Sequence, residues 1–271
     1  MPAKHDQLTI VSVYGHNDGS SALPSLAHSV RELPGSKGLL ISRYKPQSLP
    51  KGIQWRQCGF VDYLQYSVFM MHCLQAYIDT DYALIVQDDG WVLNGENFKD
   101  EYYEYDYIGA PSHCGKVDDK FYLNFSWQQF ENRTVVQNGG FCLRSKKFLQ
   151  APNTYGIPHR QANEIHNWNE DAQLSAILRA DFESLGFRYA DELTARNFSI
   201  EYLAPGFHDD LDLNALLGHH AQCRKLIGDK HVKLTVNEPD LDQIWGERKV
   251  LNFLTGLGYR IDYADGNPYQ G

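Results

Sequence analysis

Short apolar runs separated by polar turns dominate the first third of the chain and predict buried strands. The runs are rich in β-branched residues, and strands covered on both faces of a sheet have this near-continuous apolar character. They occupy residues 8–14, 37–42 and 82–86, and residues 53–58 form a shorter, more polar third run between them. We therefore expect four early strands in one sheet.

A helical pattern fills the gap between the third and fourth runs, over residues 60–78. Apolar residues recur there at steps of three and four positions, the spacing of one helix face. They are Val61, Leu64, Val68, Met71, Leu74 and Ile78. A shorter helix is expected over residues 25–33, before Pro34 and Gly35 end it. This order predicts an α/β fold with a mostly parallel central sheet flanked by helices.

The pattern is weaker in the second half of the chain. Residues 112–134 are polar and aromatic without a clean period, which predicts a long loop or irregular insertion. A helix is expected over residues 170–178, and a short one over 241–254. Residues 185–189 and 195–202 suggest further short strands.

The fourth apolar run stops abruptly at polar residues. Tyr82–Val86 leads directly into Gln87, Asp88, Asp89 and Gly90. Ligands of open α/β sheets bind at the carboxyl ends of strands, and carboxylates there suit a hard divalent cation. A simple Asp-Gly turn after a strand explains the same residues without any ligand. Both interpretations remain open from this stretch alone.

The first run also ends in a polar cluster. Tyr14 closes the run, and Gly15, His16, Asn17 and Asp18 follow it. In a nucleotide-binding α/β fold this is the natural place for contacts to base and ribose. A surface loop is an equally good interpretation, because the cluster lacks a Gly-x-Gly-x-x-Gly pattern.

Two further segments carry candidate chemistry. Asn138, Gly139 and Gly140 precede a short apolar run, and glycines let backbone amides approach a ligand closely, although a tight turn would use them too. Glu170 and Asp171 stand in the first turn of a predicted helix. Acids there interact favourably with the helix dipole, and a carboxylate at such a place can also act as a general base.

Composition narrows the class of protein. The chain has 271 residues, with 42% apolar and 22% charged residues, as in soluble globular proteins with one large domain. A net charge of −9 without a basic run argues against a nucleic-acid partner. Five cysteines without a Cys-x-x-Cys pair favour a reducing compartment. Without a signal-peptide pattern or an apolar run of ~18 residues, we expect a cytoplasmic protein with no transmembrane segment.

Taken together, the motifs resemble those of glycosyltransferases of the GT-A fold, most closely a poorly characterised group of bacterial and viral members. The shared segments are Gln87–Asp89, Tyr105–Pro111 (YDYIGAP), Asn138–Arg144 (NGGFCLR), Glu170–Asp171 and Gly206–His208. The resemblance covers roughly residues 8–210. It implies a GT-A-like (Rossmann-like) nucleotide-sugar-binding and catalytic domain over residues 1–224, with residues 225–271 as an extension packed on it.

The resemblance also implies a reaction. Such enzymes move a sugar from a nucleotide-diphosphate-sugar donor to a hydroxyl of a glycan or glycolipid acceptor, commonly with Mn²⁺ or Mg²⁺. Asp89 would be the main metal ligand with Asp88 assisting, while Gln87 replaces the first Asp of the Asp-x-Asp motif. His208 would complete the metal site, with His219 or His220 as the alternative.

The remaining roles follow from the same resemblance. Glu170 and Asp171 match the acidic pair of inverting members, with Asp171 as base and Glu170 as its orienting or acceptor-binding partner. Asn138, Gly139 and Gly140 would line the donor-sugar or acceptor pocket. Tyr14, Gly15 and His16 would contact the nucleotide. Peripheral association with a membrane stays open for a glycolipid acceptor.

Other functions remain open at this level. A sugar-phosphate nucleotidyltransferase also uses an α/β sheet and acidic metal ligands, but it normally has a basic, glycine-rich loop that the segment after the first strand lacks. A glycoside hydrolase needs two facing carboxylates and no nucleotide. A non-catalytic carbohydrate-binding protein would explain the many aromatic residues but not the acids at strand ends.

Overall fold

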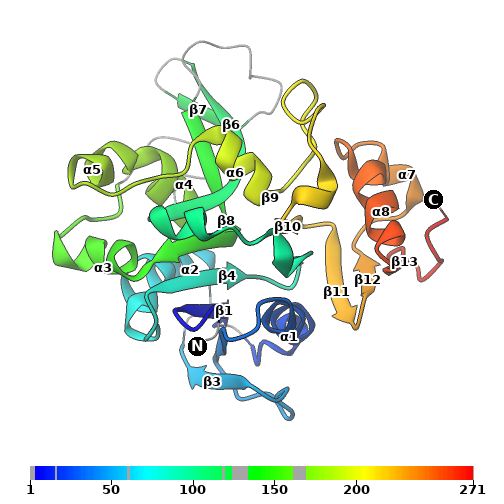
Figure 1. The fold of residues 1–271 in the computed structure, drawn as a ribbon, viewed down its shortest axis with the longest axis horizontal. Coiled ribbons are helices and arrows are strands. Elements are labelled where there is room, and N and C mark those ends of the chain that lie inside the picture. Colours follow the sequence, from blue (N-terminus) through cyan, green and yellow to red (C-terminus); the bar gives the residue numbers. More distant parts are fainter. Residues whose placement is uncertain are drawn as a thin grey trace.

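The computed structural model describes residues 4–15, 17–59, 62–117, 120–123, 134–160 and 169–270. Its centre is a sheet of seven strands in the order β3-β2-β1-β4-β8-β6-β7 (Figure 1). The bounds of these strands are β1 Leu8–Tyr14, β2 Lys37–Ser42, β3 Ile53–Gln57, β4 Tyr82–Val86, β6 Tyr107–Val117, β7 Lys120–Leu123 and β8 Thr134–Ser145.

The sheet has two halves of different kind. β3, β2, β1 and β4 pair in parallel, whereas β4 with β8, β8 with β6 and β6 with β7 pair antiparallel. The prediction of a single α/β domain with a helix-flanked central sheet is confirmed. Its parallel part is limited to the four strands that the apolar runs predicted.

Both faces of the sheet are buried, which explains the continuous apolar runs. Neighbouring residues on a strand point to opposite faces. Ile10 accordingly belongs to one core cluster, together with Leu26 of α1 and Phe198 of α6, and Val11 belongs to another, with Phe148 of α3. The helices are α1 Leu23–Glu32, α2 Tyr63–Val68, α3 Lys146–Thr154, α4 Glu170–Ala172, α5 Arg179–Ser184 and α6 Glu192–Phe198.

The helix predicted over residues 60–78 is present in its described part. α2 continues without a break into a π-helical turn, Phe69–Cys73, and a 3₁₀ turn, Leu74–Ala76. Phe60 and Val61 lie outside the described residues. No helix in the described part of the chain is long and apolar enough to cross a membrane.

Three secondary-structure predictions are wrong. Residues 185–189 form no strand, because they are a turn and loop after α5 in which Tyr189 makes an isolated bridge to Tyr107. The described part of the expected loop 112–134 forms strand, because β6 runs to Val117 and β7 follows it. Backbone pairing holds this antiparallel extension, which reaches beyond the helical layers and needs no apolar period (Figure 1). The expected strand 195–202 is strand only at Ser199–Ile200, because the residues up to Phe198 belong to helix α6. The Asp191 side chain caps this helix by accepting hydrogen bonds from the amides of Leu193 and Thr194.

Two small sheets complete the structure. One joins β5 (Gly90–Val92), β10 (Gly218–His220) and β9 (Ser199–Ile200). The other joins β11 (Arg224–Gly228), β12 (His231–Leu234) and β13 (Arg260–Asp262), beside α7 (Glu238–Leu241) and α8 (Glu247–Gly256). A third core cluster mixes residues 91–93 and 200–216 with residues 226–263, so the end of the chain packs against its middle.

Candidate active site

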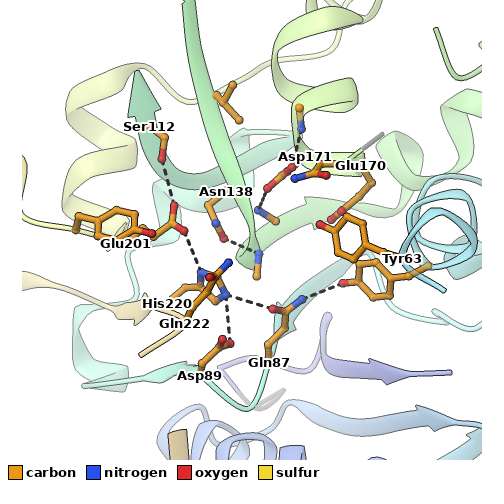
Figure 2. A pocket seen from close by; sticks show the side chains of 17 residues that line it. Tyr63, Gln87, Asp89, Ser112, Asn138, Glu170, Asp171, Glu201, His220 and Gln222 are labelled. Atoms are coloured by element: carbon orange, nitrogen blue, oxygen red, sulfur yellow. Dashed lines mark hydrogen bonds and ion pairs between the residues drawn. The ribbon is translucent and has the colours of Figure 1, made fainter. Parts of the chain in front are cut away.

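A cavity of about 380 Å³ opens where the two halves of the central sheet meet. Its walls come from the end of β4, from β6 and β8, and from α2, α4 and β10 (Figure 2). The lining residues extend from Tyr63 to Gln222 along the chain. A volume of this size accommodates a small ligand such as a sugar.

Most of the predicted site residues line this cavity. They are Gln87, Asp89, Asn138, Gly139, Gly140, Glu170 and Asp171. The lining of the cavity does not include Tyr14, Gly15, Asp88 or His208. His16 lies outside the described residues.

Asp88 and Tyr14 lie next to the cavity rather than in it. The Tyr14 hydroxyl accepts a hydrogen bond from the Asp88 amide at 3.0 Å. The Asp88 carboxylate pairs with Lys225, whose Nζ lies 2.9 Å from Oδ2. The two adjacent acids at the end of β4 therefore have different environments.

His220, not His208, stands beside the acids. His208 accepts a hydrogen bond from the Ala204 amide at its Nδ1. His220 reaches the cavity because β10 pairs antiparallel with β5, in a register that sets His220 opposite Gly90. The neighbouring His219 packs its ring against Trp91, with the ring centroids 4.0 Å apart.

Two polar side chains converge on one ring nitrogen of His220. Nε2 of His220 lies 3.2 Å from Oδ1 of Asp89 and 3.2 Å from Oε1 of Gln87 (Figure 2). The other end of the Gln87 amide donates to the Tyr66 hydroxyl at 3.0 Å, which turns Oε1 toward the histidine. Asp89 Oδ1 is buried and faces the His220 ring, with which it forms an ion pair when the ring is protonated. We call these three residues (Gln87, Asp89 and His220) the β4–β10 corner.

The β4–β10 corner has the donor set of a hard cation site. Carboxylate and amide oxygens are ligands for Mg²⁺ and Mn²⁺, and imidazole is a common partner. Neighbouring ligands of an octahedral cation with bonds of about 2.1 Å lie roughly 3 Å apart, close to the spacings here. No cluster of three or more His, Cys, Asp or Glu side chains suited to a metal occurs in the described part, so the third donor would be an amide.

The field in the cavity is negative. Asp89, Glu170, Asp171 and Glu201 line it, and no lysine or arginine stands among its described lining residues. Burial alone would lower the pKa of His220, but Asp89, then Glu201 and Asp171, outweigh burial and raise it to about 9. The β4–β10 corner therefore favours positive charge.

The two acids at the start of α4, Glu170 and Asp171, have different surroundings. Glu170 is buried and forms an ion pair with the buried Arg144, with Oε1 and the guanidinium nitrogen 3.0 Å apart. Asp171 is partly exposed to the cavity and accepts hydrogen bonds from the Gly139 and Ala172 amides. Burial, and then the neighbouring Glu170, raise the pKa of Asp171 to about 6.

The two glycines of β8 are required by close packing. A Cβ on Gly139 would lie 2.3 Å from Oε1 of Glu170, and a Cβ on Gly140 would lie 2.3 Å from the His220 ring. Side chains on the opposite faces of the strand therefore approach its bare backbone. The space that glycine leaves open is filled by the protein's own residues.

Sequence reasoning missed Glu201 and the aromatic residues. Glu201 lies 3.8 Å from Nδ1 of His220, accepts a hydrogen bond from Ser112, and has a pKa that burial raises. Tyr63 and Tyr66 of α2 form another wall of the cavity. The sequence gives no local sign of these roles, because they depend on tertiary pairing.

Comparisons with known proteins complete the description. A family model described as "Protein of unknown function (DUF5672)" matches residues 54–219. A search of the curated proteins finds no match. Among solved structures, the chain is similar to the galactosyltransferase LgtC in complex with donor and acceptor sugar analogues, at 11% identity and a TM-score of 0.48, over 92% of this chain and 95% of that one.

A second similar structure is the glycosyltransferase GlyE of Streptococcus pneumoniae TIGR4. Its identity to this chain is 15% and the TM-score is 0.44. The match covers 78% of this chain and 53% of GlyE.

Proposed function

We propose that this chain, which belongs to the DUF5672 family of proteins of unknown function, is a glycosyltransferase of GT-A type. It would transfer a hexosyl group from a nucleotide-diphosphate sugar to a hydroxyl of a glycan or glycolipid, with inversion at the anomeric carbon. The observation that carries the proposal is one small cavity with a cation-type donor set at one wall and a separate, partly exposed carboxylate at another.

The charge of the cavity supports the use of a cation. Three lining carboxylates without a lysine or arginine partner, those of Asp89, Asp171 and Glu201, would repel the diphosphate of a donor. Gln87, Asp89 and His220 are the residues that would hold Mn²⁺ or Mg²⁺, with His220 in the role that the motif pattern gave to His208. Bound there, the cation would offset the charge of the diphosphate and of the departing leaving group.

Asp171 is the proposed general base. It would accept the proton of the acceptor hydroxyl while that oxygen bonds to the anomeric carbon and the bond to the nucleoside diphosphate breaks. Its raised pKa brings it closer to the range in which a base works near neutral pH. The Gly139 amide and the first turn of α4 fix its direction.

Glu170 fits an orienting role, because its carboxylate is held by Arg144. Asn138 accepts a hydrogen bond from the Gly140 amide, which keeps the β8 backbone in place between the acids and His220. We retain Tyr14, Gly15 and His16 as candidates for the nucleotide. Tyr14 is tied to the end of β4 through the Asp88 amide, which supports this placement.

The described cysteines are compatible with a cytoplasmic enzyme. Cys58, Cys73, Cys142 and Cys223 are free thiols. A glycolipid acceptor would then be reached by peripheral association with a membrane, which vesicle co-sedimentation in the presence of the acceptor lipid would test.

Calorimetric titration tests the proposal. A panel of nucleoside diphosphates is titrated with and without Mn²⁺ into the wild type, Asp89→Ala and the matched control Asp88→Ala. We expect one nucleotide to bind in the presence of Mn²⁺ and Asp89→Ala to lose that binding, with a much smaller effect of Asp88→Ala. Absence of nucleotide binding by the folded wild type would refute the transferase assignment, and binding without Mn²⁺ would remove the cation from it.

A further inference from the structure

One wall of the cavity carries an exposed aromatic ring. Tyr63, the first residue of α2, lines the cavity although the residue is 56% exposed. Its ring stacks on Tyr66, with centroids 5.8 Å apart and planes at 27°. Tyr66 covers one side of the ring, and Tyr63 is among the side chains that line the cavity in Figure 2.

The ring is held in place rather than free to swing. The Asp62 side chain caps α2 by accepting a hydrogen bond from the Gln65 amide at 2.8 Å. Tyr66 in turn accepts a hydrogen bond from Gln87. Tyr63 is thus connected through its stacking partner to the β4–β10 corner, and an ordered ring costs little entropy when a ligand binds.

The acids of α4 act on the same ring. Desolvation, and then the charges of Glu170 and Asp171, raise the pKa of Tyr63, so its hydroxyl stays neutral. The Tyr63 ring and Asp171 both line the cavity, and Figure 2 shows them on the same side of it. A ligand stacked on Tyr63 would lie beside Asp171.

The charge of the cavity restricts that ligand. An acidic sugar would bring a further carboxylate beside Asp89, Asp171 and Glu201, with no lysine or arginine among the described lining residues to receive it. An uncharged pyranose brings no such cost. Its C–H face is the kind of apolar surface that packs on an aromatic ring.

We propose that Tyr63 is the stacking platform for an uncharged pyranose, the acceptor sugar, and places one of its hydroxyls at Asp171. The assignment of this sugar as the acceptor rests on the proposed function. The sugar subsite itself rests on the ring, its anchoring and the charge around it.

The test compares Tyr63→Ala and Tyr63→Phe with Tyr155→Ala. Tyr155 is similarly exposed, at 53%, and does not line the cavity. Saturation-transfer NMR measures the binding of neutral methyl hexopyranosides and of methyl glucuronide to each protein. We expect Tyr63→Ala to weaken binding of the neutral sugars about tenfold, with Tyr63→Phe and Tyr155→Ala within about twofold of wild type.

The wild type should bind methyl glucuronide at least tenfold more weakly than methyl glucoside. Equal binding of the two, or neutral-sugar binding that survives Tyr63→Ala, would overturn the proposal. Where transfer is measured, Tyr63→Ala should raise the acceptor KM while metal-dependent nucleotide affinity stays within about twofold. Nucleotide binding tests the proposed function and glycoside binding tests the Tyr63 subsite, so the two fail separately.

Discussion

Two pairs of adjacent acids stand at the cavity, one at the end of β4 and one at the start of α4, and the two pairs are arranged alike. At the end of β4, Asp88 is bound by Lys225 and Asp89 faces the cavity. At the start of α4, Glu170 is bound by Arg144, while Asp171 has its carboxylate at the cavity. In each pair one acid has a basic partner and the other is placed for a ligand.

The difference between the pairs lies in their depth. Both side chains of the Arg144–Glu170 pair are almost fully buried, whereas the Lys225 side chain is 42% exposed. A buried ion pair that loses one partner leaves an uncompensated charge in the protein interior, but an exposed pair is screened by water. The same sequence feature, two neighbouring acids, therefore has structural importance at one site and much less at the other.

The largest effect is expected from removing the proposed base. Asp171→Asn keeps the size of the side chain and an oxygen for the Gly139 amide, but it cannot accept the acceptor proton. Transfer should fall about 10³-fold, within the range for general-base removal. The measurement is kcat for transfer, with metal-dependent nucleotide binding as the control that the fold and the donor site persist. A variant that retains full activity would exclude Asp171 as base.

The next largest effect is on the free energy of unfolding, and it distinguishes Glu170 from Asp88. Glu170→Ala leaves Arg144 buried without its partner and should lower the free energy of unfolding by about 3–5 kcal/mol. Asp88→Ala removes only a partly exposed pair and should cost less than about 1 kcal/mol. Urea unfolding of both variants checks this ranking. Similar losses would mean that depth does not distinguish the pairs.

A smaller effect tests the packing of β8 against the β4–β10 corner. Gly140→Ala would place a methyl group 2.3 Å from the His220 ring, so the ring must leave its position in the β4–β10 corner. The affinity for Mn²⁺ should fall about 10- to 100-fold, the range seen when groups that orient metal ligands are lost. Gly256→Ala is the matched control, because no atom lies within 4 Å of its added Cβ. Unchanged Mn²⁺ affinity in Gly140→Ala would separate His220 from the cation.

The smallest effect is a pH dependence. Because the pKa of Asp171 is raised to about 6, the base is increasingly protonated below pH 6, and kcat/KM should fall toward acid with a midpoint near that value. Charged groups that act on it are Glu170, Arg144, Glu201 and His220. A flat profile between pH 5 and 8 would contradict this expectation.

The raised pKa of Asp171 also determines how the stability of the protein changes with pH. The folded protein binds this proton more tightly than the unfolded chain, so the ionised Asp171 lowers stability as the pH rises through 6. Asp171→Asn should therefore be more stable than the wild type at pH 8, while its advantage disappears below pH 4. Thermal unfolding at the two pH values measures the difference.

The parts of the fold that the sequence predicts are those with local causes. β1, β2 and β4 are buried on both faces, so their apolar runs mark them directly, whereas β3 is an edge strand that is largely exposed beyond Ile53. The acids after β4 and at the start of α4 lie at recognisable element ends. β6 and β7 escape the pattern because backbone pairing holds them. His220 and Glu201 reach the cavity only through β10 and its neighbours, which depend on contacts far apart in the chain.

The β4–β10 corner joins residues that are 133 positions apart, Gln87 and His220. A ribosome makes the chain in order, so β4 and its acids leave the ribosome long before their histidine exists. β8, which covers the edge of β4, is made in between. Chains that end before β10 should therefore lack the corner, and capture of a cation would mark the moment at which synthesis has passed His220.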